Sequence, residues 1–543
     1  MVAATSTSHL YGYPDDELDV ETARTGRPSV AIPQSKFEQP QKNTVVDGKV
    51  LIKRVELKGK SLFPKYGVNK QYLNRKLNTA YKKLEPWMSI SDMHYLADTL
   101  TLAYQQKGLT FNQVFVVPSE IENNTLTLNV LTGSISEITI KNNKLYKSSQ
   151  IRKYFTRLLG KVVYEPDIQQ AMKEGNLLPG LKLFGFFSMG ANPGQVRLNL
   201  HVVSETQHDY NLRFDNYGVN NTGVHRMMGH YVQNNVTGNS DSLQANLILT
   251  SEVGNIFGSL IYSRPLDSSS LFGASISTNQ FEVNGEFEQL GLTGHLATVS
   301  TFHQKQLLRE SNALADFSQA LNFKHSEIRS NSGSDEINAL LSQNSDYFTY
   351  RPSLKATVIW PSQTQKQTLT VASTVGMISK TNEENLDDLI FRLDVNYDHE
   401  YRWKKVPNQM VTYLNTRINY APGNLPSSEK TVMTGPYGVR AYKPALFSAD
   451  TVYSLSLEHT LKSMDPTDNL SMLPFVFLDG AYGEQNHGEQ LSDSFFGAGF
   501  GVNFNFYKKL IGSVTVGVPF GSDADNRSDE DSVVVYGNMT LEF

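Results

Sequence analysis

Cysteine is absent from all 543 residues of the chain. This absence excludes thiol catalysis, disulfide scaffolds and zinc sites with cysteine ligands. A large excess of charge is missing too, because 49 lysines and arginines stand against 54 aspartates and glutamates, a formal net charge of -5. Such a balance offers no basic field for nucleic acid. We therefore expect no thiol chemistry and no nucleic-acid partner.

Long apolar runs are also missing. A membrane-spanning helix needs about 20 mostly apolar residues, whereas the best stretches, at 181–187 and 472–478, are short and interrupted by Lys182 or Pro474. Helical membrane proteins are thereby excluded. A transmembrane β-barrel is not, because only every second residue of its strands meets lipid. Residues 1–12 have neither a charged start nor an apolar core, so they do not predict a signal peptide.

The N-terminal residues 1–46 are polar and rich in Thr, Ser, Gln and Pro, which predicts an extended linker. Within them, residues 14–24 predict a short helix. Acidic residues crowd its first turn after Pro14, and Arg24 and Gly26 stand at its end. A tail without regular structure is the alternative interpretation.

Two stretches of mixed character follow, residues 47–132 and 133–204. In both, strand spacing gives way to two segments of helical spacing and then returns. The predicted order β-α-α-β-β describes a small two-layer α+β module, and its recurrence strengthens the prediction. The first module is expected to have strands at 50–57, 110–117 and 125–131 and helices at 69–84 and 89–106. The second is expected to have strands at 135–140, 181–189 and 195–203 and helices at 147–159 and 165–175.

From residue 205 onward helical periodicity disappears, and two-residue alternation runs to the last residue, Phe543. In 391–398, for example, one face is wholly apolar and the other carries charge. About sixteen such segments begin at His208 and end at Phe543, roughly 21 residues for each strand with its connection, which suits strands of about 9–11 residues that cross a membrane. A chain that ends in Phe after an alternating strand is also typical of outer-membrane barrels.

Alternation alone fits two folds. In a soluble sandwich the apolar faces meet each other, whereas in a membrane barrel they face lipid and the polar faces line a lumen. Long segments, an aromatic-rich apolar face and Arg, Asp and Asn on the other face favour an all-β transmembrane barrel. The connections agree with this interpretation, being tight at 217–222 and long at 329–344 and 422–447, because short periplasmic turns alternate with long outer loops in such barrels.

No constellation for catalysis, a cofactor or a metal emerges. His225 and His230 fall on opposite faces of a strand, which makes them poor co-ligands of a metal. No Gly-x-Ser-x-Gly elbow occurs. The glycine-rich stretches at 291–294 and 497–501 lack the helix and the Lys-Ser/Thr pair of a phosphate-binding loop. The sequence therefore predicts no enzyme, no cofactor and no metal.

A basic run, Lys53, Arg54, Lys58 and Lys60, opens the first module. Such a run attracts an acidic segment of a partner, or it protects an exposed strand edge from pairing with another chain. The sequence leaves both interpretations open.

The whole arrangement resembles the TpsB transporters of two-partner secretion, which belong with the BamA-like superfamily of outer-membrane assembly proteins. Residues 107–133 are similar to the family's passage from the first module to the second, and 214–243 to its first hairpin and second turn. Residues 435–442, Gly-Pro-Tyr-Gly-Val-Arg-Ala-Tyr, resemble the signature of the long sixth outer loop, Val-Arg-Gly followed by an aromatic. Residues 477–481, Phe-Leu-Asp-Gly-Ala, resemble the barrel-wall motif Phe-x-Asp-x-Gly.

The resemblance implies a site made of these last two motifs. Its loop part is Gly438, Val439, Arg440 and Tyr442, and its barrel-wall part is Phe477 and Asp479. If the loop folds into the lumen, the Arg440 guanidinium can form a charge-assisted, forked contact with the Asp479 carboxylate. Phe477, two residues earlier on a strand, then faces the same way and packs against the loop. Without the family, the plain interpretation is a solvated loop arginine and an unrelated aspartate.

Both motifs depart from the family pattern at one position, since Ala441 and Ala481 stand where glycine is usual. If the loop glycine needs a positive φ, Ala441 changes the backbone geometry at the tip. The two alanines fall in the two halves of one implied contact, so they can compensate each other.

The resemblance further implies an outer-membrane transporter of a Gram-negative bacterium, with its barrel wall in contact with outer-membrane lipid. Residues 47–132 and 133–204 are then POTRA-like domains in the periplasm that capture an unfolded exoprotein by β-augmentation. The barrel, residues 205–543, secretes this client without nucleotide hydrolysis. The predicted helix at 14–24 is the implied resting plug, and Phe543 is the terminal residue for the barrel assembly machinery.

The implied client is a TpsA-type exoprotein. Within the family the chain looks most like the CdiB-type transporters, whose clients are CdiA-type toxins of contact-dependent inhibition. A haemolysin or an adhesin is the alternative client. Two alternative classes are a BamA-like assembly factor, which usually carries more POTRA domains, and a gated porin, which needs none.

Overall fold

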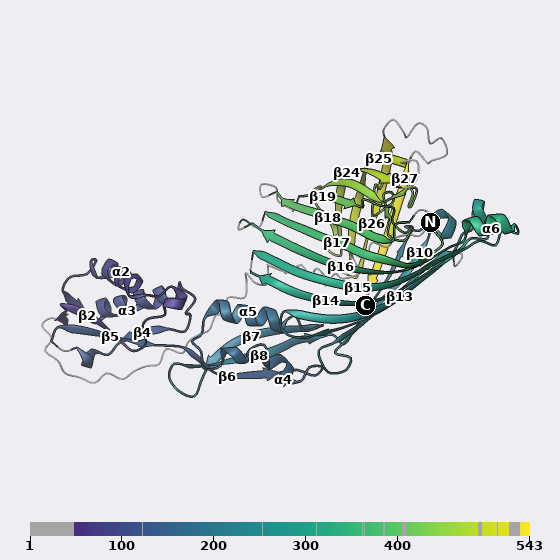
Figure 1. The fold of residues 1–543 in the computed structure, drawn as a ribbon. Coiled ribbons are helices and arrows are strands. Elements are labelled where there is room, and N and C mark those ends of the chain that lie inside the picture. Colours follow the sequence, from purple (N-terminus) through teal and green to yellow (C-terminus); the bar gives the residue numbers. More distant parts are fainter. Residues whose placement is uncertain are drawn as a thin grey trace. The chain divides into compact units, whose positions relative to one another are not determined.

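The computed structural model describes residues 48–543 except 122, 252–253, 311, 361, 363, 384–385, 404–409, 487–490, 508 and 521–532. The linker expected at 1–46, with its helix at 14–24, lies outside the described residues. The described chain forms two compact units, residues 48–206 and residues 207–543 (Figure 1). No helix in this described part combines the length and apolar content that a bilayer crossing demands.

The first module has the predicted α+β composition with one added pair of strands. Its elements are β1 (Lys49–Leu51), β2 (Arg54–Lys58), α2 (Lys70–Tyr81), β3 (Trp87–Ser89), α3 (Ile90–Gln105), β4 (Gln113–Val116) and β5 (Thr125–Leu131). Three strands form a sheet in the order β2-β5-β4, with β2 parallel and β4 antiparallel to β5. Helix α3 buries the predicted stripe against this sheet, namely Met93, Leu96, Leu100 and Tyr104.

The single strand expected at 50–57 is wrong, because the chain changes partner in the middle. β1 pairs with β3, whereas β2 pairs with β5. At the change, the Ile52 amide donates to the Pro86 carbonyl and the Lys53 amide to the Asn124 carbonyl, both at 2.8 Å. Ile52 itself is fully buried in the module's core. Period-two spacing changes phase at this point, because Val50 and Ile52 share one phase whereas Val55 and Leu57 share the other. The two adjacent exposed residues Lys53 and Arg54 mark the break in the sequence.

The second module repeats the topology of the first. Its elements are β6 (Ser134–Lys141), α4 (Ser148–Arg152), α5 (Glu165–Gly175), β7 (Leu181–Met189) and β8 (Gln195–Glu205). The sheet order is β6-β8-β7, with β6 parallel and β7 antiparallel to β8. The helix expected at 147–159 is shorter than predicted, since α4 ends at Arg152. A 3-10 turn at Thr156–Leu158 then keeps the apolar side chains on the buried side.

The second unit is a closed barrel, in which each strand pairs antiparallel with its neighbours and the last pairs with the first (Figure 1). The predicted barrel of about sixteen strands is thereby confirmed, and the soluble sandwich is excluded. A short additional strand, β23 (Met464–Thr467), extends the edge of β24. The sixteen strands are β9 (His208–Asp215), β10 (Arg226–Asn234), β11 (Ser242–Thr250), β12 (Asn255–Pro265), β13 (Ser270–Glu282), β14 (Thr293–Arg309), β15 (Ala313–Arg329), β16 (Gln343–Ile359), β17 (Gln365–Thr381), β18 (Leu389–Arg402), β19 (Val411–Tyr420), β22 (Thr451–Thr460), β24 (Leu470–Gln485), β25 (Leu491–Phe506), β26 (Leu510–Phe520) and β27 (Val534–Glu542).

The burial of the barrel strands is inverted relative to a water-soluble protein. Large apolar side chains such as Leu321 and Phe500 are 59% exposed, whereas small polar ones such as Ser300 and Thr349 are buried. Since successive strand residues point to opposite faces, the apolar face is the outer one and the polar face lines the interior. An outer face of this kind is stable only in an apolar environment.

The tight connection expected at 217–222 is wrong. β9 ends at Asp215 and β10 begins at Arg226, so the connection runs over residues 216–225 and includes a 3-10 turn at Asn220–Thr222. It lies at the same barrel end as the long connections 330–342 and 421–450, because the direction of antiparallel strands alternates. The Asp215 carboxylate holds this longer connection by accepting from the Tyr217 amide at 3.1 Å and from Arg226 Nε at 2.7 Å.

Candidate functional site: a loop bound to the inner barrel wall

The long connection 421–450 between β19 and β22, which we call the inner loop, has its own internal structure. Its two short strands, β20 (Thr431–Val432) and β21 (Ser448–Ala449), pair antiparallel with each other. The segment that carries the predicted loop motif thus has its two ends held together by the loop's own strand pairing, in addition to its contacts with the barrel wall.

A tight turn precedes the motif arginine. The Gly435 amide donates to the Val439 carbonyl at 3.2 Å, and the Val439 amide donates to the Met433 carbonyl at 2.9 Å. Glycine is required at both ends of this turn. Gly435 has a φ of 104°, and a Cβ on Gly438 would lie 2.1 Å from the Met433 carbonyl oxygen. The turn therefore fixes the direction in which Arg440 leaves the loop.

The Arg440 side chain contacts four residues of the barrel wall. Its Nε and Nη2 donate to the two carboxylate oxygens of Asp479 at 2.8 and 3.0 Å. Its Nη1 donates to Glu458, and its Nη2 also donates to Ser456 Oγ at 3.2 Å. The guanidinium carbon lies 3.9 Å from the centre of the Phe477 ring, a cation–π contact. This combination of a forked contact and a stacked ring suits the planar arginine and not lysine.

Strand register explains why these wall residues converge. In the pairing of β22 with β24, Ser456 lies opposite Asp479 and Glu458 lies opposite Phe477. Residues two apart on a strand share a face, so all four point to the interior. Asp479 is only 2% exposed, and it also accepts from the Arg440 main-chain amide at 3.1 Å and from Ser456 Oγ at 2.7 Å. Removing the partner of a charge this buried typically costs about 3–5 kcal/mol.

Ala441 fits because the residues that it faces on the wall are glycines. Ala441 is not among the residues with positive φ, so its backbone does not require glycine. Its methyl group faces Gly497 of β25 and its Cα faces Gly517 of β26. A Cβ on Gly497 would lie 2.1 Å from the Ala441 Cβ, and one on Gly517 would lie 2.7 Å from the Ala441 Cα. Ala441 and Ala481 belong to the same buried cluster, as expected if they compensate each other.

The remaining motif residues hold the loop to the strands that close the barrel. Val439 and Tyr442 are buried. The Tyr442 ring meets Phe495 of β25 edge-on at 5.1 Å, and its carbonyl oxygen accepts from the hydroxyl of Tyr536 of β27. The inner loop thus contacts wall residues from β22 to β27.

The structure brings six of the seven predicted site residues together: Gly438, Val439, Arg440, Tyr442, Phe477 and Asp479. The seventh, Phe543, lies apart beyond the end of β27, 64% exposed, with its ring stacked on Tyr210 at 5.2 Å. Sequence reasoning missed Glu458 and Ser456, although a signal was present. In 453–458 the apolar residues alternate with Ser454, Ser456 and Glu458, which places these three on the inner face.

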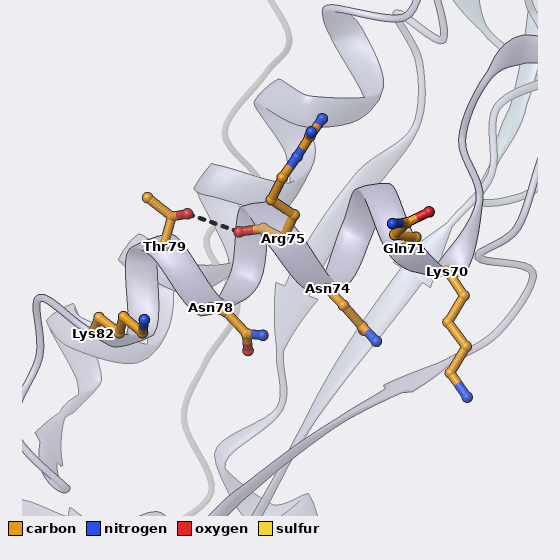
Figure 2. A pocket seen from close by; sticks show the side chains of 7 residues that line it. All are labelled: Lys70, Gln71, Asn74, Arg75, Asn78, Thr79 and Lys82. Atoms are coloured by element: carbon orange, nitrogen blue, oxygen red, sulfur yellow. Dashed lines mark hydrogen bonds between the residues drawn. The ribbon is translucent and has the colours of Figure 1, made fainter.

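A second candidate surface lies on helix α2 of the first module. Residues 48–132 contain twice as many lysines and arginines as aspartates and glutamates. In the basic run at the start of the module, which lies outside α2, Lys58 pairs with Glu120 at 3.0 Å. Three of the side chains that line the surface on α2 are cationic and none is acidic. Figure 2 shows the seven side chains that line it: Lys70, Gln71, Asn74, Arg75, Asn78, Thr79 and Lys82.

Metal ligation has no support in the part of the chain that the structure describes, where no group of three or more His, Asp or Glu could hold an ion. The Nδ1 atom of His230 is engaged with the Asn246 side-chain oxygen at 2.6 Å. The contacts that the structure shows around Arg440 are pairings of fixed charges with Glu458 and Asp479.

Two sequence models of protein families match the chain. The family described as haemolysin secretion/activation protein ShlB/FhaC/HecB matches residues 194–504, and the ShlB-type POTRA domain matches residues 50–133. The first match covers more than half of the chain and includes both motifs of the candidate site.

Individual relatives are distant in sequence. The heme/hemopexin transporter protein HuxB of Haemophilus influenzae (strain 86-028NP) is 22% identical over 463 residues, 81% of this chain and 79% of HuxB. The outer membrane transporter CdiB of Dickeya dadantii (strain 3937) is 24% identical over 153 residues, 28% of this chain and 27% of that protein. The solved structure of CdiB from Escherichia coli superposes with a TM-score of 0.66 at 18% identity and covers 93% of each chain, which shows a shared fold.

The close contact between Ala441 and Gly497 predicts that a larger residue at position 497 weakens the binding of the inner loop. In Gly497→Ala the added methyl overlaps the Ala441 methyl, and overpacking of this kind costs about 1–3 kcal/mol. We expect the inner loop to leave its seat more often, so that the purified protein conducts more current in planar lipid bilayers. The matched control is Gly537→Ala on β27, where an added Cβ meets nothing within 4 Å. Equal conductance of the two variants would contradict the role given to Gly497.

Proposed function

Because the chain belongs to the haemolysin secretion/activation protein family ShlB/FhaC/HecB, whose members are two-partner secretion transporters, we propose that it secretes an unfolded exoprotein through its barrel. The barrel lies in the outer membrane and the POTRA part lies in the periplasm, as in the rest of the family. In the resting state the inner loop, held by Arg440, closes the barrel. Secretion requires the loop to leave this position.

The observation that carries the proposal is the bound position of the inner loop. A loop whose arginine is engaged by Asp479, Glu458 and Phe477 has a defined closed state. The contact consists of charges and hydrogen bonds, which water and an entering chain can replace as the loop moves away. Closure of this type is reversible without a nucleotide, and folding of the client outside the cell gives the transport its direction.

Capture of the client falls to the two modules. In the described residues, β2 and β4 are the edge strands of one sheet, and β6 and β7 are the edge strands of the other. Such edges can accept an extended chain as an additional strand. The cationic surface on α2 adds long-range attraction for acidic segments of the client, which raises the rate of encounter. Main-chain pairing then supplies affinity for a chain that is still unfolded.

For the client itself we propose a CdiA-type toxin of contact-dependent inhibition. Support comes from the CdiB of Dickeya dadantii and from the fold shared with CdiB from Escherichia coli. A second candidate is an exoprotein that handles heme or hemopexin, because the similarity to HuxB covers a much larger share of the chain. A haemolysin or an adhesin fits the same transport. We further propose that the exposed terminal Phe543 serves recognition by the barrel assembly machinery.

Deletion of the modules tests the transport proposal. In cells that also express a candidate exoprotein, deleting residues 47–204 is expected to abolish delivery of that exoprotein to the cell surface, because nothing captures it in the periplasm. Surface delivery is measured with antibodies on intact cells, and heat-modifiable migration in gels checks that the barrel still assembles. Undiminished delivery by an assembled barrel would reject the capture role of the modules.

Charge reversal on α2 tests the electrostatic part. The triple variant Lys70→Glu, Arg75→Glu, Lys82→Glu is expected to bind the client at least about tenfold more weakly, since exposed charge pairs contribute about 0.5 kcal/mol each. The difference should shrink as salt is raised. The matched control reverses three exposed lysines of the second module, Lys141, Lys153 and Lys161. If both triple variants bind alike, the surface on α2 has no special role.

A further inference from the structure

A buried carboxylate lies at the other end of the inner loop, and the closure described above makes no use of it. Glu429 precedes β20, is almost fully buried and belongs to the same connection as Arg440. An ionised carboxylate is rarely buried without partners, because the loss of hydration must be offset by charge pairing and hydrogen bonds. The partners of Glu429 therefore indicate what this end of the loop does.

The partners of the Glu429 carboxylate that the structure shows come from the barrel wall. Lys324 of β15 forms an ion pair with Oε1, and the Tyr347 hydroxyl of β16 donates to the same oxygen at 3.1 Å. Nη1 of Arg392 of β18 lies 3.7 Å from Oε2 and donates to the Glu429 carbonyl oxygen at 2.6 Å. The neighbouring Ser428 hydroxyl bonds to Tyr347 as well.

The wall side of this contact is fixed independently of the loop. Nη2 of Arg392 donates to Asp394 Oδ2 at 3.1 Å, and Nη2 of Arg351 donates to the same oxygen at 2.9 Å. Asn419 donates to Asp394 Oδ1 at 2.6 Å. These contacts hold the Arg392 guanidinium in place, so that the cationic site exists before Glu429 enters it, and little ordering is needed on binding.

The loop side is fixed as well. Lys430, the next residue, bonds to Asp450 at the end of the inner loop at 3.2 Å and to Asn424 at 2.9 Å. Its neighbours Thr431–Val432 form β20, which pairs with β21. The segment from Glu429 to Arg440 is therefore held together by contacts within the loop itself.

We propose that the inner loop is held at two points of opposite polarity. Arg440 enters an acidic site on β22 and β24, and Glu429 enters a cationic site on β15, β16 and β18. Glu429 is a positioning residue of the closed state, and full opening requires both sites to release the loop. The inference rests on the proposed closure of the barrel by this loop, and it adds that loss of the Arg440 contact alone leaves the loop tethered.

The opposite charges of the two sites allow the loop to bind the wall in one orientation only. A cation cannot occupy the site of Lys324 and Arg392, and an anion cannot occupy the site of Asp479 and Glu458, because like charges in a partly buried site repel strongly. The loop can thus return after each transport event only in the original orientation. A single anchor would fix the loop at one point but would leave its direction open.

The test uses the full-length protein in planar lipid bilayers, with open time as the readout. Glu429→Gln keeps the shape and removes the charge, and Lys324→Met removes the same ion pair from the wall side. Each is expected to increase the open time about tenfold or more. Because Glu429→Gln already removes the ion pair with Lys324, the double variant should open no more than Glu429→Gln alone. Glu429→Gln combined with Arg440→Ala should open more than either of its single variants, since these lie at separate sites.

The matched control is Glu327→Gln on β15, whose carboxylate pairs with the exposed Arg329 and not with the loop; wild-type open time is expected. Heat-modifiable migration in gels verifies that each variant assembles. If either Glu429→Gln or Lys324→Met fails to assemble, the other variant still tests the same ion pair. Wild-type gating in both Glu429→Gln and Lys324→Met would overturn the inference, as would additive effects of the two. If Arg440→Ala also left the gating unchanged, the proposed closure itself would fail.

Discussion

The contact between Arg440 and Asp479 is the interaction on which the interior of this barrel depends. It joins a loop and a strand that are far apart along the chain, and it does so where both groups are shielded from bulk water. Shielding makes the pair strong while it is formed and makes either charge costly when it is left alone. The barrel wall complements the loop in shape as well as in charge, because Gly497 and Gly517 leave room for the loop at Ala441.

The inner loop is held to the wall by apolar packing around Ala441 and Tyr442 as well as by charge. The charged contacts of the loop are reversible, because water or a passing chain can replace the partners of each charge. The Arg440 site and the Glu429 site use the same principle with opposite signs. Their opposite polarity gives the loop one orientation in the closed state and connects closure to the strands on both sides of β19.

Much of the fold could be predicted because alternation along a strand determines which side chains face inward. Segment 391–398 shows this clearly, with Arg392 and Asp394 on the inner wall. The break after Leu51 was missed because it depends on two partner strands distant in sequence, β3 and β5. The connection at 216–225 was missed because the ion pair of Asp215 with Arg226 holds a longer turn than the spacing suggests. The Arg440–Asp479 contact was predicted only through the family motif. Glu429 has no such motif, and its partners on β15, β16 and β18 follow from the path of the loop, which local pattern does not encode.

The central claim is that the Arg440 contact holds the inner loop against the barrel wall. Because the chain contains no cysteine, spin labels can be placed at two introduced cysteines only, one at the exposed loop residue Tyr437 and one at the outward-facing Val299 of β14. Electron–electron distance measurements in lipid nanodiscs should give one narrow distribution for the otherwise unmodified protein and a broad one for Arg440→Ala. The same narrow distribution in both proteins would contradict the claim.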